Sequence, residues 1–223
     1  MFVIERIIGI VAPHRCAGCG SEGSLLCDWC RPDFALPLPS RCAICKKATP
    51  QSQVCANCRK TFRLRHIWVR TGYDGLPLKL VQGFKFEHQQ AAAPILASLM
   101  AEALPDLPKD TIVCPIPTTT KHVRQRGYDH ADLLARALAK QLGCKYLPLL
   151  MRDGQLRQVG SSRDKRLHQL KQAFRTHRQP PSGSPVLLVD DITTSGGTLS
   201  AAADCLHNAG VKVVDAVVFA QKE

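Results

Sequence analysis

The sequence has no long apolar run and few aromatic residues. None of its apolar stretches reaches the ~20 residues that a membrane-spanning helix needs. The apolar segment at residues 2–12 is interrupted by Glu5 and Arg6, and no small-residue cleavage site follows it. We therefore interpret it as a short amphipathic helix and not as a signal peptide. Only 5% of the 223 residues are aromatic, which limits base stacking. These features predict a cytoplasmic protein with no membrane span.

Two common nucleotide-binding motifs are also missing. There is no Walker loop with its lysine and no G-x-G-x-x-G run, so a nucleoside triphosphatase and a dinucleotide-binding protein are excluded. Residues 186–198 instead read VLLVDDITTSGGT. The apolar residues 186–189 predict a buried strand, two acids follow at its end, and a helical pattern begins at Leu199.

The small residues between the acids and the helix are typical of an anion site. A helix start presents unpaired N–H groups and a favourable dipole, and small residues allow a phosphate to approach the backbone. An ordinary strand-to-helix turn with capping acids is the alternative, but it does not require this ordered pattern. The candidate residues are Asp190, Asp191, Thr194, Ser195, Gly196, Gly197 and Thr198.

Eight of the 11 cysteines form four C-x-x-C pairs near the N-terminus. This spacing predicts two structural zinc ions, because two sulfurs separated by two residues reach one tetrahedral metal. Sequential pairing is the simplest arrangement, and a crossed pairing stays open. The regular spacing argues against disulfides. The predicted ligands are Cys16, Cys19, Cys27 and Cys30 for one ion and Cys42, Cys45, Cys55 and Cys58 for the other.

The zinc ions also change the charge balance. The formal net charge of +12 falls to about +8 if eight thiolates bind two Zn²⁺ ions, so the chain stays basic. Outside its metal ligands, the segment at residues 14–60 offers almost no core. Its closing basic run, Arg59 to Arg65, predicts a solvated face.

From residue 63 onward, strand and helix patterns alternate. This alternation predicts an α/β domain with a largely parallel sheet and helices on both faces, preceded by a small double zinc-ribbon domain at residues 1–62. Ligands of such sheets bind beyond the carboxyl ends of the strands. The predicted strands are 66–73, 111–114, 144–149, 186–189 and 211–219; the predicted helices are 76–86, 91–103, 129–142, 163–172 and 199–209.

Two further segments are rich in cations. Lys121, Arg124 and Arg126 follow a predicted strand end at Pro115 and Pro117, where they suit a second anion such as a pyrophosphate. A longer basic segment at residues 157–178 suits either a lid over a phosphorylated substrate or a track for a nucleic-acid backbone.

The stretch at 186–198 resembles the phosphoribosyl pyrophosphate (PRPP) signature of type I phosphoribosyltransferases. With the four C-x-x-C pairs and the motifs around Lys85, Pro115, Arg124 and Gln158, the whole chain resembles the ComF family. That family usually has Asn-Gln where this chain has Asp129-His130.

The resemblance implies that the two acids hold the ribose hydroxyls and that residues 194–198 hold the 5′-phosphate of PRPP or another ribose-5-phosphate ligand. It also implies a cytoplasmic protein that acts on single-stranded DNA in natural transformation, with a helicase or recombination mediators as partners. The alternative is a genuine Mg²⁺-dependent phosphoribosyltransferase of nucleotide salvage or a related pathway. In that case Lys121, Arg124 or Arg126 would assist the departure of pyrophosphate.

Overall fold

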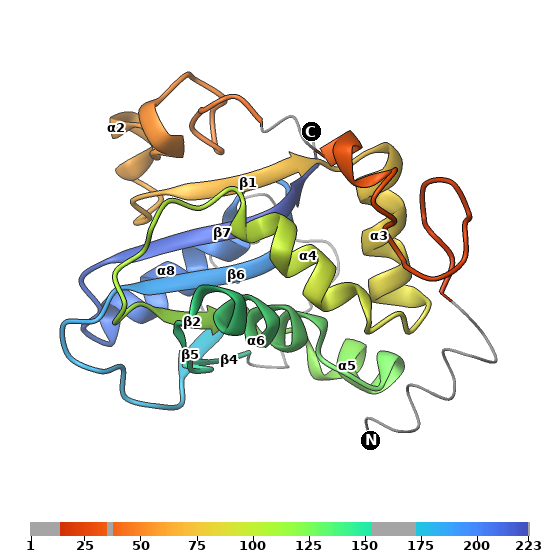
Figure 1. The fold of residues 1–223 in the computed structure, drawn as a ribbon. Helices are drawn as coiled ribbons and strands as arrows, with labels where there is room; N and C mark the ends of the chain where they lie inside the picture. The colour runs from red at the N-terminus through yellow and green to blue at the C-terminus, as the bar shows by residue number, and fades with distance from the viewer. Residues whose placement is uncertain (1–13, 35–37, 153–172, 223) are drawn as a thin grey trace, which may run out of the picture.

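A computed structural model describes residues 14–34, 38–152 and 173–222 (Figure 1). The predicted helices at residues 2–12 and 163–172 lie outside this range, as does most of the basic segment at 157–178.

The predicted α/β architecture is confirmed. Within the described residues, five parallel strands form one sheet in the order β1-β7-β6-β2-β3. The central strands β6 and β7 are long and mostly buried, as expected where a sheet is covered on both faces. The strands are β1 (Ile67–Gly72), β7 (Val214–Gln221), β6 (Val186–Thr193), β2 (Ile112–Pro115) and β3 (Lys145–Tyr146).

Helices pack on both faces of the sheet (Figure 1). The side chains of β6 alternate between the two faces, with Leu187 and Val189 in one buried cluster and Val186 and Leu188 in the other. The first cluster contains residues of α3 (Gly75–Phe86), α4 (Ala92–Ala101) and α6 (His130–Leu142). The second contains residues of α8 (Gly197–Asn208) and of the antiparallel pair β4 (Leu150–Arg152) and β5 (Phe174–Thr176).

The basic segment after β2 forms a short helix, α5 (Thr120–Arg126), where the sequence analysis expected only a cationic run before a turn. Gly127 ends this helix with a left-handed φ of 77°, a conformation that favours glycine. Asp129 then caps α6, as predicted, because its side chain accepts hydrogen bonds from the backbone N–H groups of Ala131 and Asp132.

The two cysteine-rich segments pack directly against the α/β body. We call residues 14–34 the first ribbon and residues 38–62 the second ribbon. They contain short helices η1 (Arg31–Phe34), η2 (Pro50–Ser52) and α2 (Ala56–Arg59). Apart from their cysteines, the ribbons bury few apolar residues, and these join the core of the α/β body: Leu25 and Phe34 lie in the cluster that contains α3 and α4, and Val54 lies in the cluster that contains α8. The sheet and its helices supply the apolar surface that the ribbons lack.

Three predicted strands have different bounds in the structure. The strand at 186–189 continues to Thr193, because β7 offers backbone partners as far as Gln221. The strand at 211–219 starts only at Val214. The segment at 144–149 contributes just two residues to the main sheet, and the chain then turns into β4 of the separate antiparallel pair.

The described residues contain no helix that is both long and apolar enough to cross a bilayer.

Candidate ligand site at the carboxyl edge of the sheet

The proposed phosphate loop lies between β6 and α8. Thr194 and Ser195 are exposed, and Gly197 and Thr198 are the first residues of α8. Their amide groups have no partner inside the helix, because the first turn of any helix lacks preceding carbonyls. Gly196 caps the helix with a φ of 75°, which few residues other than glycine adopt without strain. The loop therefore has the backbone geometry of an anion site.

The two acids point to opposite faces of β6. Side chains alternate along a strand, so Asp190 lies on the same face of β6 as Val186 and Leu188. This face is covered by α8, and the loop begins on this side. Asp191 shares the side of Leu187 and Val189 and faces α3 and α6. Because β6 continues to Thr193, both acids lie within the strand and not in the loop after it.

Asp191 is buried, with a residue exposure of 1%, and two side chains from different helices surround it. Its Oδ2 atom lies 2.8 Å from Nζ of Lys85 on α3 and 3.4 Å from Nε2 of His130 on α6. No described residue forms a well-aligned hydrogen bond with this oxygen, so we treat the contact with Lys85 as an ion pair. Burial alone would raise the pKa of Asp191, but Lys85 and His130 overcome it and lower the pKa below its usual value.

Asp190 is in a different electrostatic state. It is only partly buried, and its Oδ1 accepts a hydrogen bond of 2.9 Å from the backbone N–H of Asp191. Burial and the adjacent Asp191 carboxylate raise the pKa of Asp190 well above its usual value, although Lys85 opposes the shift. The two acids are thus unequal: Asp191 is a buried carboxylate with fixed partners, and Asp190 retains access to a ligand.

Arg126 extends this cluster to the surface. Its Nη1 donates to Nδ1 of His130 at 2.9 Å, which leaves the Nε2–H of that ring facing Asp191. Burial, together with Lys85 and Arg126, lowers the pKa of His130 despite the attraction of Asp191, so the ring is neutral near pH 7. The guanidinium of Arg126 also lies 5.0 Å from the ring centroid of Phe86, which is 63% exposed.

Only some of the other predicted site residues lie close to this cluster. Pro115 ends β2 beside Val189 of β6 and is buried, and Pro117 follows two residues later. Lys121 and Arg124 are on α5; the Arg124 side chain is exposed and makes no ion pair with any described residue. The structure therefore brings together Pro115, Arg126 and the two acids, whereas Arg124 stays on the outer surface.

The second ribbon packs on the phosphate loop. A Cβ atom at Gly196 would lie 2.5 Å from Cδ1 of Ile44 and 3.5 Å from the ring of Phe62. The Gln221 side chain, at the end of β7, donates to the backbone carbonyl of Ala43 at 2.8 Å in a buried position. Ala43 and Ile44 are the two residues between Cys42 and Cys45, so one C-x-x-C turn of the second ribbon forms a wall beside the loop.

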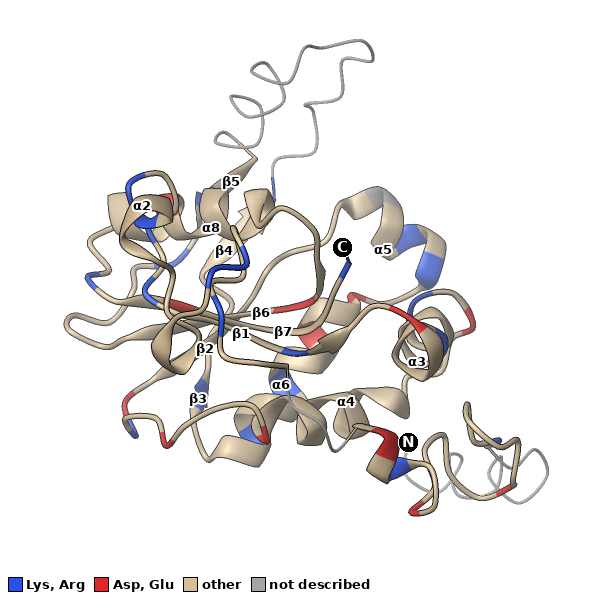
Figure 2. Cartoon of the chain, turned by 90° about the horizontal axis from the view of Figure 1, so that it is seen from above, with Lys and Arg blue, Asp and Glu red and all other residues tan. Residues whose placement is uncertain are grey.

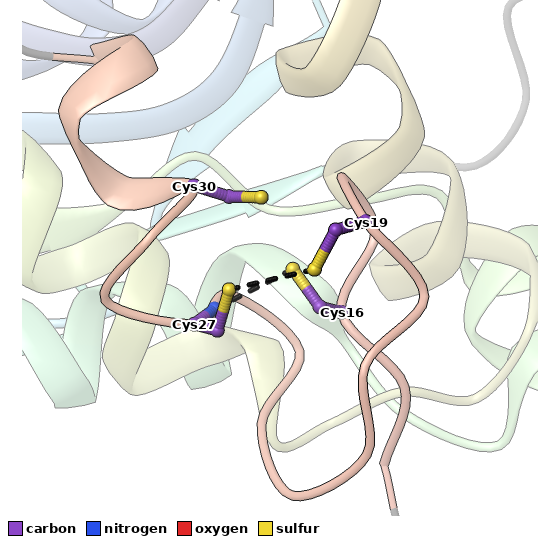
Figure 3. A group of neighbouring side chains, drawn as sticks. All are labelled: Cys16, Cys19, Cys27 and Cys30. Atoms are coloured by element: carbon purple, nitrogen blue, oxygen red, sulfur yellow. Dashed lines mark hydrogen bonds between the residues drawn. The ribbon is translucent and has the colours of Figure 1, made fainter.

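The cysteines form two clusters among the described residues, with the predicted sequential pairing. Figure 3 shows the first cluster, Cys16, Cys19, Cys27 and Cys30. The ligand atoms within each cluster lie within 4.8 Å of one another, and none of the cysteines is in a disulfide. The Sγ atoms of Cys19 and Cys27 are 3.6 Å apart, as are those of Cys45 and Cys55. Each cluster can hold one metal ion.

The protonation of the thiols fits a bound cation. Burial opposes ionisation of Cys16, but the backbone N–H groups of Cys27, Cys19 and Gly18 lower its pKa to about 6. Burial and the neighbouring thiols raise the pKa of Cys30 in the same cluster to about 12. Four adjacent thiolates repel one another, and a metal ion compensates for this repulsion.

A model of the phosphoribosyl transferase domain matches residues 129–223, which include α6, both central strands and the candidate phosphate loop. An adenine phosphoribosyltransferase of solved structure from Thermoanaerobacter pseudethanolicus is 19% identical, with a TM-score of 0.39 over 64% of this chain and 72% of that chain. The sheet and the matching domain model define a phosphoribosyltransferase-like α/β fold.

Three relatives match most of the chain. Competence protein F of Haemophilus influenzae is 30% identical over 90% of this chain and 93% of its own length. Competence protein ComFC of Bacillus subtilis is 26% identical over 83% of this chain and 79% of its own length. DNA utilization protein YhgH of Escherichia coli is 26% identical over 85% of this chain and 93% of its own length. The chain belongs to the ComF/YhgH competence family, whose members carry a phosphoribosyltransferase domain.

The sequence analysis assigned no role to Lys85 or His130. Lys85 lies between Phe84 and Phe86 at the end of α3, and a cation between two large apolar residues was a signal for a buried partner. His130 directly follows Asp129, the cap of α6, and is buried. Their shared partner, Asp191, is distant in sequence from both, so only the fold shows the cluster.

Proposed function

We propose that the protein binds PRPP or a related ribose-5-phosphate ligand at the carboxyl edge of the sheet, and that it acts with single-stranded DNA during DNA uptake. The observation that supports this most directly is the acid pair followed by an exposed loop and a helix start. Residues 194–198 would hold the 5′-phosphate through backbone N–H groups and hydroxyls. Mg²⁺ bound with the ligand would neutralise part of the pyrophosphate charge.

The two acids would have separate roles. Asp190 would accept hydrogen bonds from the ribose hydroxyls, because it is the acid with access to the α8 side. Asp191 would position the end of β6 through its ion pair with Lys85 and its contact with His130. Arg126, with Lys121 and Arg124 on the same helix, would attract the pyrophosphate.

We further propose that both cysteine clusters hold structural Zn²⁺. Zn–S bonds of about 2.3 Å in a tetrahedron place the sulfurs about 3.8 Å apart, close to the 3.6 Å seen in both clusters. A set of four thiolates with no other ligand type favours zinc over magnesium or calcium. Cysteines that stay reduced also fit a cytoplasmic location.

Calorimetry with PRPP and Mg²⁺ tests the ligand proposal. We expect saturable binding to the native protein and at least a roughly 10-fold weaker affinity for Asp190→Asn, because one to two hydrogen bonds to a charged group are lost. Asp106→Asn, which removes an exposed carboxylate on a loop away from the site, is the matched control. Equal affinities for all three proteins would contradict the assignment of Asp190.

Fluorescence anisotropy with a labelled oligothymidylate tests the DNA proposal. The net charge of +12 and the names of the relatives motivate it. Binding should weaken steeply as salt rises, because non-specific affinity comes mostly from counterion release. A protein that binds no single-stranded DNA even at low salt would refute this half of the proposal and leave the ligand half intact.

A transferase activity is the second candidate. Arg126, which contacts Asp191 through His130, is the observation that favours it, since a leaving pyrophosphate needs such a cation. Release of labelled pyrophosphate from PRPP in the presence of candidate bases, lost in Arg126→Gln, would support it. Binding of PRPP without any release of pyrophosphate would indicate that the protein senses PRPP and does not catalyse transfer.

A further inference from the structure

A basic groove lies at the opposite edge of the sheet from the candidate ligand site. It has a volume of about 300 Å³, and the end of α2, the segment after the second ribbon, the end of α8 and the start of β7 line it. In Figure 2, basic segments gather around α2. Its charged side chains are Arg59, Arg63, Arg65 and Lys212, with His207 beside them.

Three of these cations have no acidic partner. Arg59, Arg63 and Lys212 are exposed and form no ion pair with any described residue. Arg65 differs, because Asp215 holds it through two contacts of 3.2 and 2.7 Å. Three uncompensated cations around a concave surface create a local positive potential that attracts anions.

The groove walls are held in place by polar contacts. Asp215, which is 5% exposed, also accepts the backbone N–H of His66 at 3.0 Å. His207 near the end of α8 lies 2.7 Å from the carbonyl oxygens of both Val211 and Arg63. These contacts join three separate segments, so the cations around the groove are preorganised.

We propose that this groove binds the sugar-phosphate backbone of single-stranded DNA, at a site separate from the phosphate loop. This inference rests on the proposed action on DNA and specifies its location. The three cations come from separate segments, the end of α2, the segment after the second ribbon and the segment just before β7, and such an open basic groove suits successive phosphates of one strand. Val213, which is partly exposed, adds an apolar contact for a sugar, and the buried Leu64 and Val214 lie beneath it. Contacts to phosphates and sugars carry no information about the bases, so we expect this binding to be independent of sequence.

The two sites are far apart. The groove lies at the amino ends of the strands, and the phosphate loop lies at their carboxyl ends. Helix α8 connects them: Gly197 at the loop and His207 at the groove are ten residues apart, about 15 Å at 1.5 Å per residue. DNA and PRPP therefore bind without competing, and groove substitutions leave the affinity for PRPP unchanged.

The test compares two triple variants with the same change in net charge. The groove variant carries Arg59→Gln, Arg63→Gln and Lys212→Gln. The control variant replaces three exposed lysines on other surfaces: Lys109→Gln, Lys140→Gln and Lys145→Gln. Anisotropy titrations of a labelled oligothymidylate over a series of salt concentrations give the affinity and its salt dependence, and calorimetry with PRPP and Mg²⁺ checks the other site.

We expect the groove variant to lose affinity on the order of 100-fold at low salt and its log–log salt slope to fall by about 2, at ~0.7 per phosphate contact. The control variant should keep nearly the full slope. If both variants lose the same affinity for the oligonucleotide, the assignment of DNA binding to the groove is wrong, although the protein still binds DNA. A native protein that does not bind the oligonucleotide overturns both proposals. A mononucleotide that binds the groove as tightly as the oligonucleotide would show a small-anion site instead. If the triple variant melts early, the single variants give the same comparison at a slope change of about 0.7 each.

Discussion

Replacing Lys85 with methionine should strongly destabilise the protein. The substitution removes the cation 2.8 Å from Asp191 but keeps most of the apolar stem, so packing changes little. Asp191 is 1% exposed and would remain as a buried carboxylate with only the neutral His130 near its Oδ2. Breaking a buried pair by removing one partner costs ~3–5 kcal/mol, a large part of the ~5–15 kcal/mol that stabilises a typical domain.

The loss should depend on pH in a defined direction. In the native protein the pKa of Asp191 is lowered, so its contribution is present above the unfolded pKa and is lost as the pH falls through the folded pKa. Without Lys85, burial dominates and raises the pKa of Asp191 in the folded state. The penalty is then largest at high pH and is relieved as the carboxyl takes up a proton. The difference between native and Lys85→Met should therefore shrink between about pH 8 and about pH 5.

Urea unfolding followed by circular dichroism at both pH values measures these differences. Lys79→Met, on the exposed side of the same helix, is the matched control and should change stability by less than ~0.5 kcal/mol. The double variant Lys85→Met with Asp191→Asn should recover most of the loss, because no unpaired charge remains. A loss that is equal at both pH values, or that the double variant does not recover, would refute the ion-pair explanation.

Three further predictions concern the ribbons and their contacts. Gly196→Ala should cost ~1–2 kcal/mol in thermal unfolding, because φ is 75°, and adding Ile44→Ala should relieve only the steric part of the loss. Arg70→Met should cost roughly 2 kcal/mol in urea, since this buried side chain donates to a backbone carbonyl and pairs with an acid. Cys45→Ser should reduce the zinc content from two ions to one, measured by native mass spectrometry, without changing the fluorescence of Trp29 in the other ribbon; loss of both ions would contradict independent clusters.

Local patterns in the sequence predict much of this structure. The spacing of the cysteines predicts both clusters, because the ligands of each cluster lie close together in the chain. The cap of α6 at Asp129 follows for the same reason. Local patterns do not predict the extent of β6. The run of apolar residues stops at Val189, but the strand continues for as long as β7 offers backbone partners. A strand boundary inside a sheet depends on its neighbour as much as on its own residues.

The parts of the two sites that sequence could not predict come from distant segments. Lys85, His130 and Asp191 meet only because α3 and α6 pack on the same face of the sheet. The basic run at residues 59–65 predicts a solvated face when it is taken alone. In the structure the amino end of β7, with Lys212, lies beside that run, and the two segments together line a groove. In both cases the missing information is tertiary contact, not local propensity.

The second ribbon contacts both proposed sites, whereas the first contacts neither. Ile44, within one C-x-x-C turn, lies against Gly196 of the phosphate loop, and Arg59, directly after Cys58, lines the basic groove. The first ribbon packs instead on α3 and α4, and Arg31 joins it to Glu102 at 2.5 Å. A metal ion bound by the second cluster would fix the relative position of its four sulfurs, and would hold the loop contact and the groove residue in one rigid unit. The two ribbons have the same spacing of cysteines but different neighbours. We therefore expect changes in the second ribbon, more than changes in the first, to affect ligand and DNA binding.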